Sequence, residues 1–140
     1  MSDLLTEAKA LQDIIVKDRR YLHQNAELGM DLPVTSAYVT KRLKEMGYEP
    51  QVIKGAGVVA LAGGKKPGKT ILLRADTDAL PILEENDLEY KSKTQNMHAC
   101  GHDAHAAMLL GAARLLKAHE DEIEGWVKLL FQPAEESLSG

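Results

Sequence analysis

Residues 104–118, AHAAMLLGAARLLKA, are followed closely by residues 126–131, WVKLLF. The first stretch is rich in Ala, Leu and Met, which predicts a well-buried helix with Asp103 at its N-cap. The second is a short apolar run that ends near Pro133, a residue without an amide hydrogen for a strand ladder, and it predicts a buried strand. A helix that leads into a buried strand favours an α/β fold, with a sheet covered by helices on both sides.

The part of the chain before this stretch continues the same alternation. Apolar residues at three- and four-residue spacing predict a first helix over residues 4–22. Pro33 at the start and Gly47 at the end predict a second helix. Residues 51–53 and 58–62 are β-branched runs between glycines and predict two paired strands. Residues 70–74 predict a further strand, with a Gly/Lys hairpin turn before it.

Composition restricts the class of protein. A chain of 140 residues predicts one compact domain, and a net charge of −4 with scattered Lys and Arg argues against nucleic-acid binding. No apolar run is long enough to cross a bilayer, and acids stand where a signal peptide needs basic residues, which predicts a cytoplasmic protein without a membrane partner. The single cysteine, Cys100, cannot form an internal disulfide and leaves a free thiol.

Residues 63–70, GGKKPGKT, fit the spacing of a phosphate-binding P-loop. That motif needs a helix opening at Lys69 and Thr70, because the phosphates are bound by amides at a helix N-terminus. It also needs a second apolar strand that ends in Asp, whereas the later strand ends in Gln132. We therefore favour a turn and a strand, and a nucleotide-binding module remains an alternative.

The chemistry is concentrated in residues 98–105, HACGHDAH, which hold three imidazoles, a thiol and a carboxylate. Cys100 and His102 are two residues apart, so in an extended segment that leads into a helix they point the same way. Borderline metals accept sulfur and nitrogen ligands together. The amides of the following helix also favour the thiolate form of a nearby cysteine. The cluster therefore predicts a metal site.

Acidic residues follow two of the predicted strands. Asp76 and Asp78 come after the 70–74 strand and are spaced to point to one side of it. Glu135 and Glu136 follow the later strand, and adjacent side chains there project in different directions, so that one can bind metal while its neighbour faces a bound water. Open α/β sheets place their sites at strand ends, which predicts that these acids join the histidines.

Four segments resemble, in order, the amidohydrolase branch of the aminoacylase and carboxypeptidase dinuclear metallopeptidases. This branch includes hippurate hydrolases, N-acetyldiaminopimelate deacetylases and auxin-conjugate hydrolases. The segments are residues 20–23 with 27–29, 74–81, 97–105 and 131–136. The resemblance implies a three-layer α/β/α metallopeptidase catalytic domain, of which residues 1–140 are the N-terminal part. Ala26 stands where a proline is usual and Asp31-Leu32 where acids are common, and neither departure touches a proposed ligand.

The resemblance also implies roles for particular residues. Cys100, His102 and Glu136 are implied as ligands in a centre of two divalent metal ions, which could be zinc, manganese, cobalt or nickel. Glu135 is implied as the general base and Asp78 as the acid that orients a ligand. Asp76 stands where related branches have a metal-binding histidine. The implied reaction is hydrolysis of the amide bond of an N-acyl amino acid by a metal-activated water.

Enzymes of that branch are much longer than this chain. They carry a further His ligand soon after the glutamate pair, another near the C-terminus, and a small lid or dimerisation domain between them. The resemblance therefore implies that the whole enzyme is a homodimer or homo-oligomer and that residues 1–140 alone are inactive. A non-catalytic metal-binding fragment is the second alternative.

Overall fold

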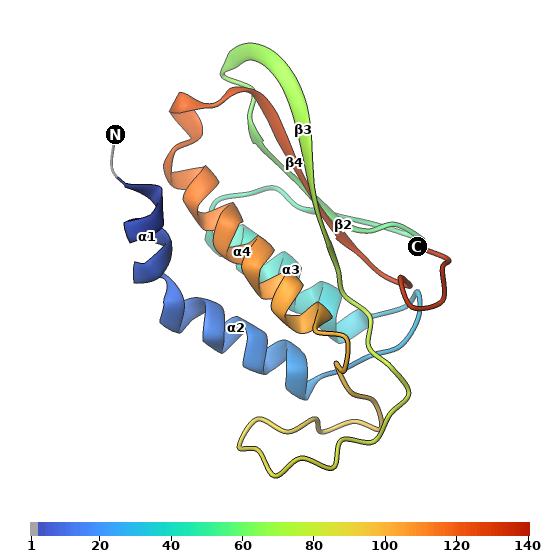
Figure 1. Ribbon diagram of the computed structural model, residues 1–140. Coiled ribbons are helices and arrows are strands. Elements are labelled where there is room, and N and C mark those ends of the chain that lie inside the picture. The colour runs from blue at the N-terminus through green and yellow to red at the C-terminus, as the bar shows by residue number, and fades with distance from the viewer. Residues whose placement is uncertain (1–2) are drawn as a thin grey trace.

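The computed structural model describes residues 3–140, which form a mixed sheet with helices packed against it (Figure 1). In chain order the elements are α1 (Leu4–Ala10), α2 (Gln12–Gln24), α3 (Pro33–Glu45), β1 (Gln51–Ile53), β2 (Gly57–Gly63), β3 (Lys66–Asp76), α4 (His102–Ala118), a 3-10 helix η1 (Glu120–Glu122) and β4 (Glu124–Gln132). The α/β class predicted from the sequence is therefore confirmed.

The four strands lie in the order β1-β2-β4-β3. β1 and β2 are antiparallel neighbours, which confirms the predicted pair, and β4 runs antiparallel to β2 and parallel to β3. The predicted hairpin between β2 and β3 is wrong, because β4 lies between them. The turn between them includes Gly64, with φ +80°, where a Cβ would come within 2.2 Å of the Trp126 ring. Only glycine fits there without displacing the start of β4.

The position of β3 argues against the nucleotide-binding alternative. Lys69 and Thr70 lie inside this strand and not at the start of a helix. The segment 63–70 therefore lacks the helix amides that a P-loop uses to bind phosphate.

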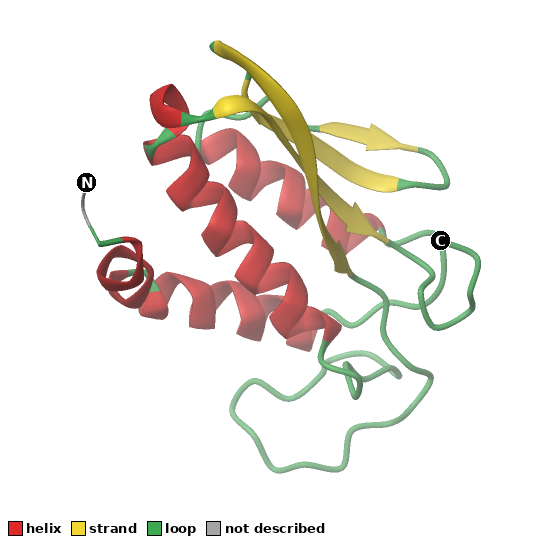
Figure 2. Ribbon diagram, turned by 45° about the horizontal axis from the view of Figure 1, so that its top comes forward, coloured by secondary structure: helices red, strands yellow, loops and turns green. Residues whose placement is uncertain are grey.

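The described helices cover one face of the sheet (Figures 1 and 2). Leu110 and Ala113 of α4 are fully buried together with Leu129 of β4, in a core that continues to α2 and α3. The opposite face exposes Leu61 and Trp126. Of the two helical layers predicted, the described residues thus supply one. No helix in the described part of the chain is long and apolar enough to span a membrane.

The single helix predicted over residues 4–22 is two helices, because the chain turns at Leu11. The Leu11 amide donates to the Ala8 carbonyl at 3.1 Å, a tight final turn that ends α1. His119, just after α4, lies 2.8 Å from Glu7 and ties α1 to the end of α4. The apolar spacing continues through the break, so periodicity alone could not reveal it.

The predicted N-cap of α4 is also wrong. The helix begins at His102, two residues earlier than predicted, and its N-cap is Gly101 in the left-handed region with φ +85°. Asp103 lies in the first turn instead, where its buried carboxylate forms an ion pair with Arg19 and a hydrogen bond with His23. The side chain that was predicted to cap the helix is therefore bound to α2.

Candidate metal centre

Three segments meet where β3 and β4 end and α4 begins (Figure 1). β3 and β4 are parallel neighbours with Asp76 opposite Gln132, so the residues that follow each strand leave the sheet side by side. The start of α4 lies against this edge, because the His102 ring nitrogen Nδ1 is 2.8 Å from the Asp78 carbonyl oxygen. The five residues singled out from the sequence, Asp78, Cys100, His102, Glu135 and Glu136, come together here.

His102 has one ring nitrogen free to bind a cation. A carbonyl oxygen can only accept, so Nδ1 donates its hydrogen to the Asp78 carbonyl, and in the neutral ring Nε2 carries the lone pair. The side chain is buried, and three carboxylates surround Nε2: Asp76 at 3.4 Å, Glu135 at 3.6 Å and Glu136 at 3.7 Å. A lone pair facing several carboxylates is repulsive unless a positive charge lies between them.

Cys100, His102 and Glu136 form one potential donor set. Their ligand atoms, a thiol sulfur, an imidazole nitrogen and a carboxylate oxygen, all lie within 4.8 Å of one another. Glu136 Oε1 is buried and has no hydrogen-bond partner among the described residues. An unpartnered buried carboxylate oxygen is costly, and a cation would satisfy it. These donors therefore fit a borderline divalent metal.

The protein groups alone do not favour the Cys100 thiolate that the helix start suggested. A hydrogen bond to Glu136 is the main cause that raises the pKa of Cys100, followed by desolvation and by the charges of Glu136, Glu135 and Asp76. The neighbouring carboxylates therefore favour the thiol form of Cys100. A bound cation would reverse this balance, because it favours the deprotonated form of a ligand.

Asp78 holds the glutamate pair in place. Its carboxylate accepts a hydrogen bond from the Glu135 amide at 3.1 Å on one oxygen and from the Glu136 amide at 3.0 Å on the other. Ala134, just before the pair, has φ +57°, a conformation that an alanine rarely adopts. The buried Asp78 therefore stabilises a strained turn, and its own carbonyl orients His102.

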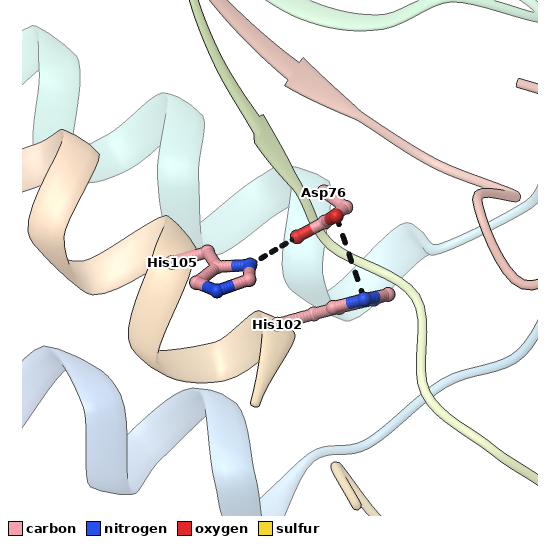
Figure 3. A group of neighbouring side chains, drawn as sticks. All are labelled: Asp76, His102 and His105. Carbon is pink, nitrogen blue, oxygen red and sulfur yellow. Dashed lines mark hydrogen bonds and ion pairs between the residues drawn. The ribbon is translucent and has the colours of Figure 1, made fainter. Parts of the chain in front are cut away.

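Asp76 and His105 lie next to His102 (Figure 3). His105 Nδ1 lies 2.6 Å from one Asp76 oxygen, and the other oxygen faces His102 Nε2. Burial would raise the pKa of Asp76, but the hydrogen bond to His105 and the nearby His102, His105 and Arg74 outweigh burial and lower it. His105 was part of the motif noted in the sequence, but no role followed from its position there.

A second cluster of buried ionisable residues joins α2 to the first turn of α4. His23 lies between two carboxylates, with Nδ1 2.8 Å from Asp103 and Nε2 3.0 Å from both oxygens of Glu84. Through these contacts His23 joins α2 to α4 and to the loop between β3 and α4. The ring of His98 is also buried, with its centroid 6.5 Å from that of His23. Neither nitrogen of His98 has a hydrogen-bond partner among the described residues, and His98 is not among the possible metal ligands found there.

Sequence reasoning missed this cluster. The residues are separated by up to 80 positions, so no local spacing relates them. One signal was available: His23 directly follows Leu22, the last apolar residue of the predicted first helix, and an imidazole buried beside it would need polar partners.

Glu84 makes the stability of this cluster depend on pH. Burial would raise the pKa of Glu84, but hydrogen bonds from the Ser92 amide, His23 and Asn86 outweigh burial and lower it from 4.5 to about 2. Because the folded pKa is lower than the unfolded value, this contribution to stability is complete above pH 4.5 and is lost as pH falls toward 2. We expect Glu84→Gln to be less stable at neutral pH and to lose less stability on acidification.

Urea unfolding followed from pH 7 to acid, for wild type and Glu84→Gln, checks this expectation. Glu85→Gln, at the exposed neighbouring position, is the matched control and should follow wild type. Equal acid dependence in Glu84→Gln and wild type would show that Glu84 is not the source.

The open mixed sheet gathers thiol, imidazole and carboxylate donors at the ends of β3 and β4 and the start of α4. Residues 72–140 match the model of Peptidase family M20/M25/M40. Residues 72–140 therefore form part of a domain of this family, and relatives of the chain include a hippurate hydrolase and an N-acetyl-L-cysteine deacetylase.

Three relatives illustrate the similarity. Thermostable carboxypeptidase 2 of Saccharolobus solfataricus is 49% identical over 138 residues, which cover 95% of this chain and 35% of that protein. Hippurate hydrolase of Campylobacter jejuni is 46% identical over 140 residues, covering 99% of this chain and 36% of that protein. The crystal structure of YXEP from Bacillus subtilis, described as a dinuclear metal-binding peptidase, superposes with a TM-score of 0.86 at 40% identity, over 91% of this chain and 36% of that one.

The chain therefore spans about a third of the length of the relatives it matches.

Proposed function

We propose that residues 1–140 are the N-terminal part of the catalytic domain of a metal-dependent amidohydrolase that cleaves the amide bond of N-acyl amino acids. The observation that carries the proposal is the environment of His102, whose free Nε2 faces the carboxylates of Glu135 and Glu136 beside the Cys100 thiol. The relatives named hippurate hydrolase and carboxypeptidase support the reaction class, since both names denote hydrolysis that releases an amino acid from an amide.

Cys100, His102 and Glu136 are the residues that would hold metal. The YXEP neighbour, described as dinuclear, supports a centre of two divalent ions, which could be zinc, manganese, cobalt or nickel. When bound, such ions would lower the pKa of a water molecule and polarise the scissile carbonyl. Further ligands and the residues that select the acyl group would come from other parts of the whole protein, which we propose to be a homodimer or homo-oligomer.

Glu135 is the proposed general base. Its carboxylate lies 3.6 Å from His102 Nε2, so it is beside the donors, but it does not belong to the Cys100, His102 and Glu136 set. The side chain is 36% exposed, which leaves it accessible to a water molecule and a substrate. Glu135 takes a proton from the attacking water and returns it to the leaving amine. Asp78 keeps Glu135 in this position through the hydrogen bond to its amide.

Removal of metal tests this proposal against a non-catalytic metal-binding role. A chain of the relatives' full length should hydrolyse N-acyl amino acids, lose this activity after dialysis against a chelator, and regain it with zinc, manganese, cobalt or nickel. Hydrolysis that persists after metal analysis shows complete removal would contradict the proposal. Metal binding without hydrolysis of any N-acyl amino acid would instead favour the non-catalytic role.

A further inference from the structure

Asp76, His102 and His105 form a second group of possible ligands, in which the ligand atoms again lie within 4.8 Å of one another (Figure 3). The two histidines are three positions apart in the first turn of α4, so their rings project from the same side of the helix and stack with centroids 5.7 Å apart. Asp76, at the end of β3, points between them (Figure 3). One carboxylate with two imidazoles is a donor set that divalent transition metals accept.

The burial of these residues suits a cation that enters from solvent. Asp76 and His102 are buried, whereas the His105 side chain is 48% exposed. His105 also borders a surface groove between β3 and α4, which Leu73 and Met108 help to line. A cation arriving through this groove would meet His105 first and the buried Asp76 carboxylate next.

We propose that Asp76, His102 and His105 form an alternative cation position, which shares His102 with the Cys100 and Glu136 donors. The sharing has a chemical consequence. The hydrogen bond from His102 Nδ1 to the Asp78 carbonyl leaves Nε2 as the only lone pair of this ring. A cation bound through His102 therefore takes one position or the other. This inference rests on the proposed function only in that the two positions have His102 in common.

The two positions differ in the cations that they favour. The Cys100 position offers a thiolate, which favours softer metals such as zinc and cobalt. The Asp76 and His105 position offers oxygen and nitrogen donors only, which suit harder ions such as manganese better. Loading with different metals is therefore expected to distribute them differently around His102.

Cobalt(II) absorption on the 140-residue chain tests the inference, because a thiolate ligand gives a charge-transfer band that nitrogen and oxygen donors do not. Wild type is expected to bind cobalt with this band, and Cys100→Ser to bind cobalt without it. Adding His105→Asn to Cys100→Ser is expected to weaken cobalt binding at least about tenfold, since loss of even an outer partner of a metal ligand costs 10- to 100-fold.

His119→Asn in the Cys100→Ser background is the matched control, because His119 lies at the other end of α4, and circular dichroism compares the folding of all variants. The inference is overturned if Cys100→Ser binds no cobalt, or if His105→Asn weakens binding no more than His119→Asn. A wild type that binds cobalt without the charge-transfer band would instead count against the Cys100 position and the proposed function. Even then, loss of cobalt binding when His105→Asn is added to Cys100→Ser would support the alternative cation position.

Discussion

Replacing Glu135 with glutamine, in a chain of the relatives' full length, is expected to lower turnover by about 10²- to 10⁴-fold and to leave the metal content unchanged. Glutamine keeps the size and the backbone amide of Glu135, so the hydrogen bond to Asp78 is retained. It removes the carboxylate that would accept the proton of the attacking water. Steady-state hydrolysis of an N-acyl amino acid and elemental analysis of the same preparation check this expectation.

Glu136→Gln is the matched control for that substitution. Glu136 is the adjacent residue and its amide is held by the same aspartate, but its carboxylate belongs to the Cys100 and His102 donor set. We expect this variant to lose metal affinity, and excess metal should restore part of its turnover. If the two variants retained equal amounts of metal and responded equally to added metal, the proposed division of roles would be wrong.

Removing a donor at Cys100 or His102 is expected to have the second large effect. His102→Ala deletes the Nε2 lone pair at the centre of the cluster, and Cys100→Ser replaces a thiol by a weaker ligand. Metal content should fall in both variants, and further in His102→Ala because both cation positions use His102, while hydrolysis should fall to the level of wild type treated with a chelator. Elemental analysis, isothermal titration with zinc and the hydrolysis assay provide the three readouts.

A histidine outside the cluster gives the comparison for this second prediction. His119 lies at the far end of α4, where it contacts Glu7 and Glu122, and His119→Ala should keep both metal and activity. Full metal occupancy and an unchanged rate in Cys100→Ser or His102→Ala would remove the basis for assigning these two residues as ligands.

The features predicted correctly from the sequence are those that depend on near neighbours. The apolar runs predicted β2 and β4, and Pro33 marked the start of α3. The gathering of Asp78, His102 and Glu136 followed from a general property of open sheets, since residues at strand ends and helix starts share one edge.

The features that were missed depend on contacts between residues far apart in the sequence, or on local conformations that the sequence pattern does not distinguish. The insertion of β4 between β2 and β3 is a pairing across the chain, which no local pattern encodes. The break at Leu11 leaves the apolar spacing intact. Asp103 has the residue type and position of an N-cap, but in the fold its carboxylate binds His23, on a helix far away in the sequence.

The central claim is that Cys100, His102 and Glu136 bind a catalytic metal beside Glu135, and anomalous X-ray diffraction from zinc-loaded crystals tests it most directly. The account predicts a zinc peak about 2.3 Å from the Cys100 sulfur, about 2.0 to 2.1 Å from His102 Nε2 and about 2.0 to 2.2 Å from a Glu136 oxygen. The Glu135 carboxylate should lie next to the zinc without binding it. A zinc peak bound elsewhere, with Cys100 and Glu136 unligated in fully loaded crystals, would contradict the claim.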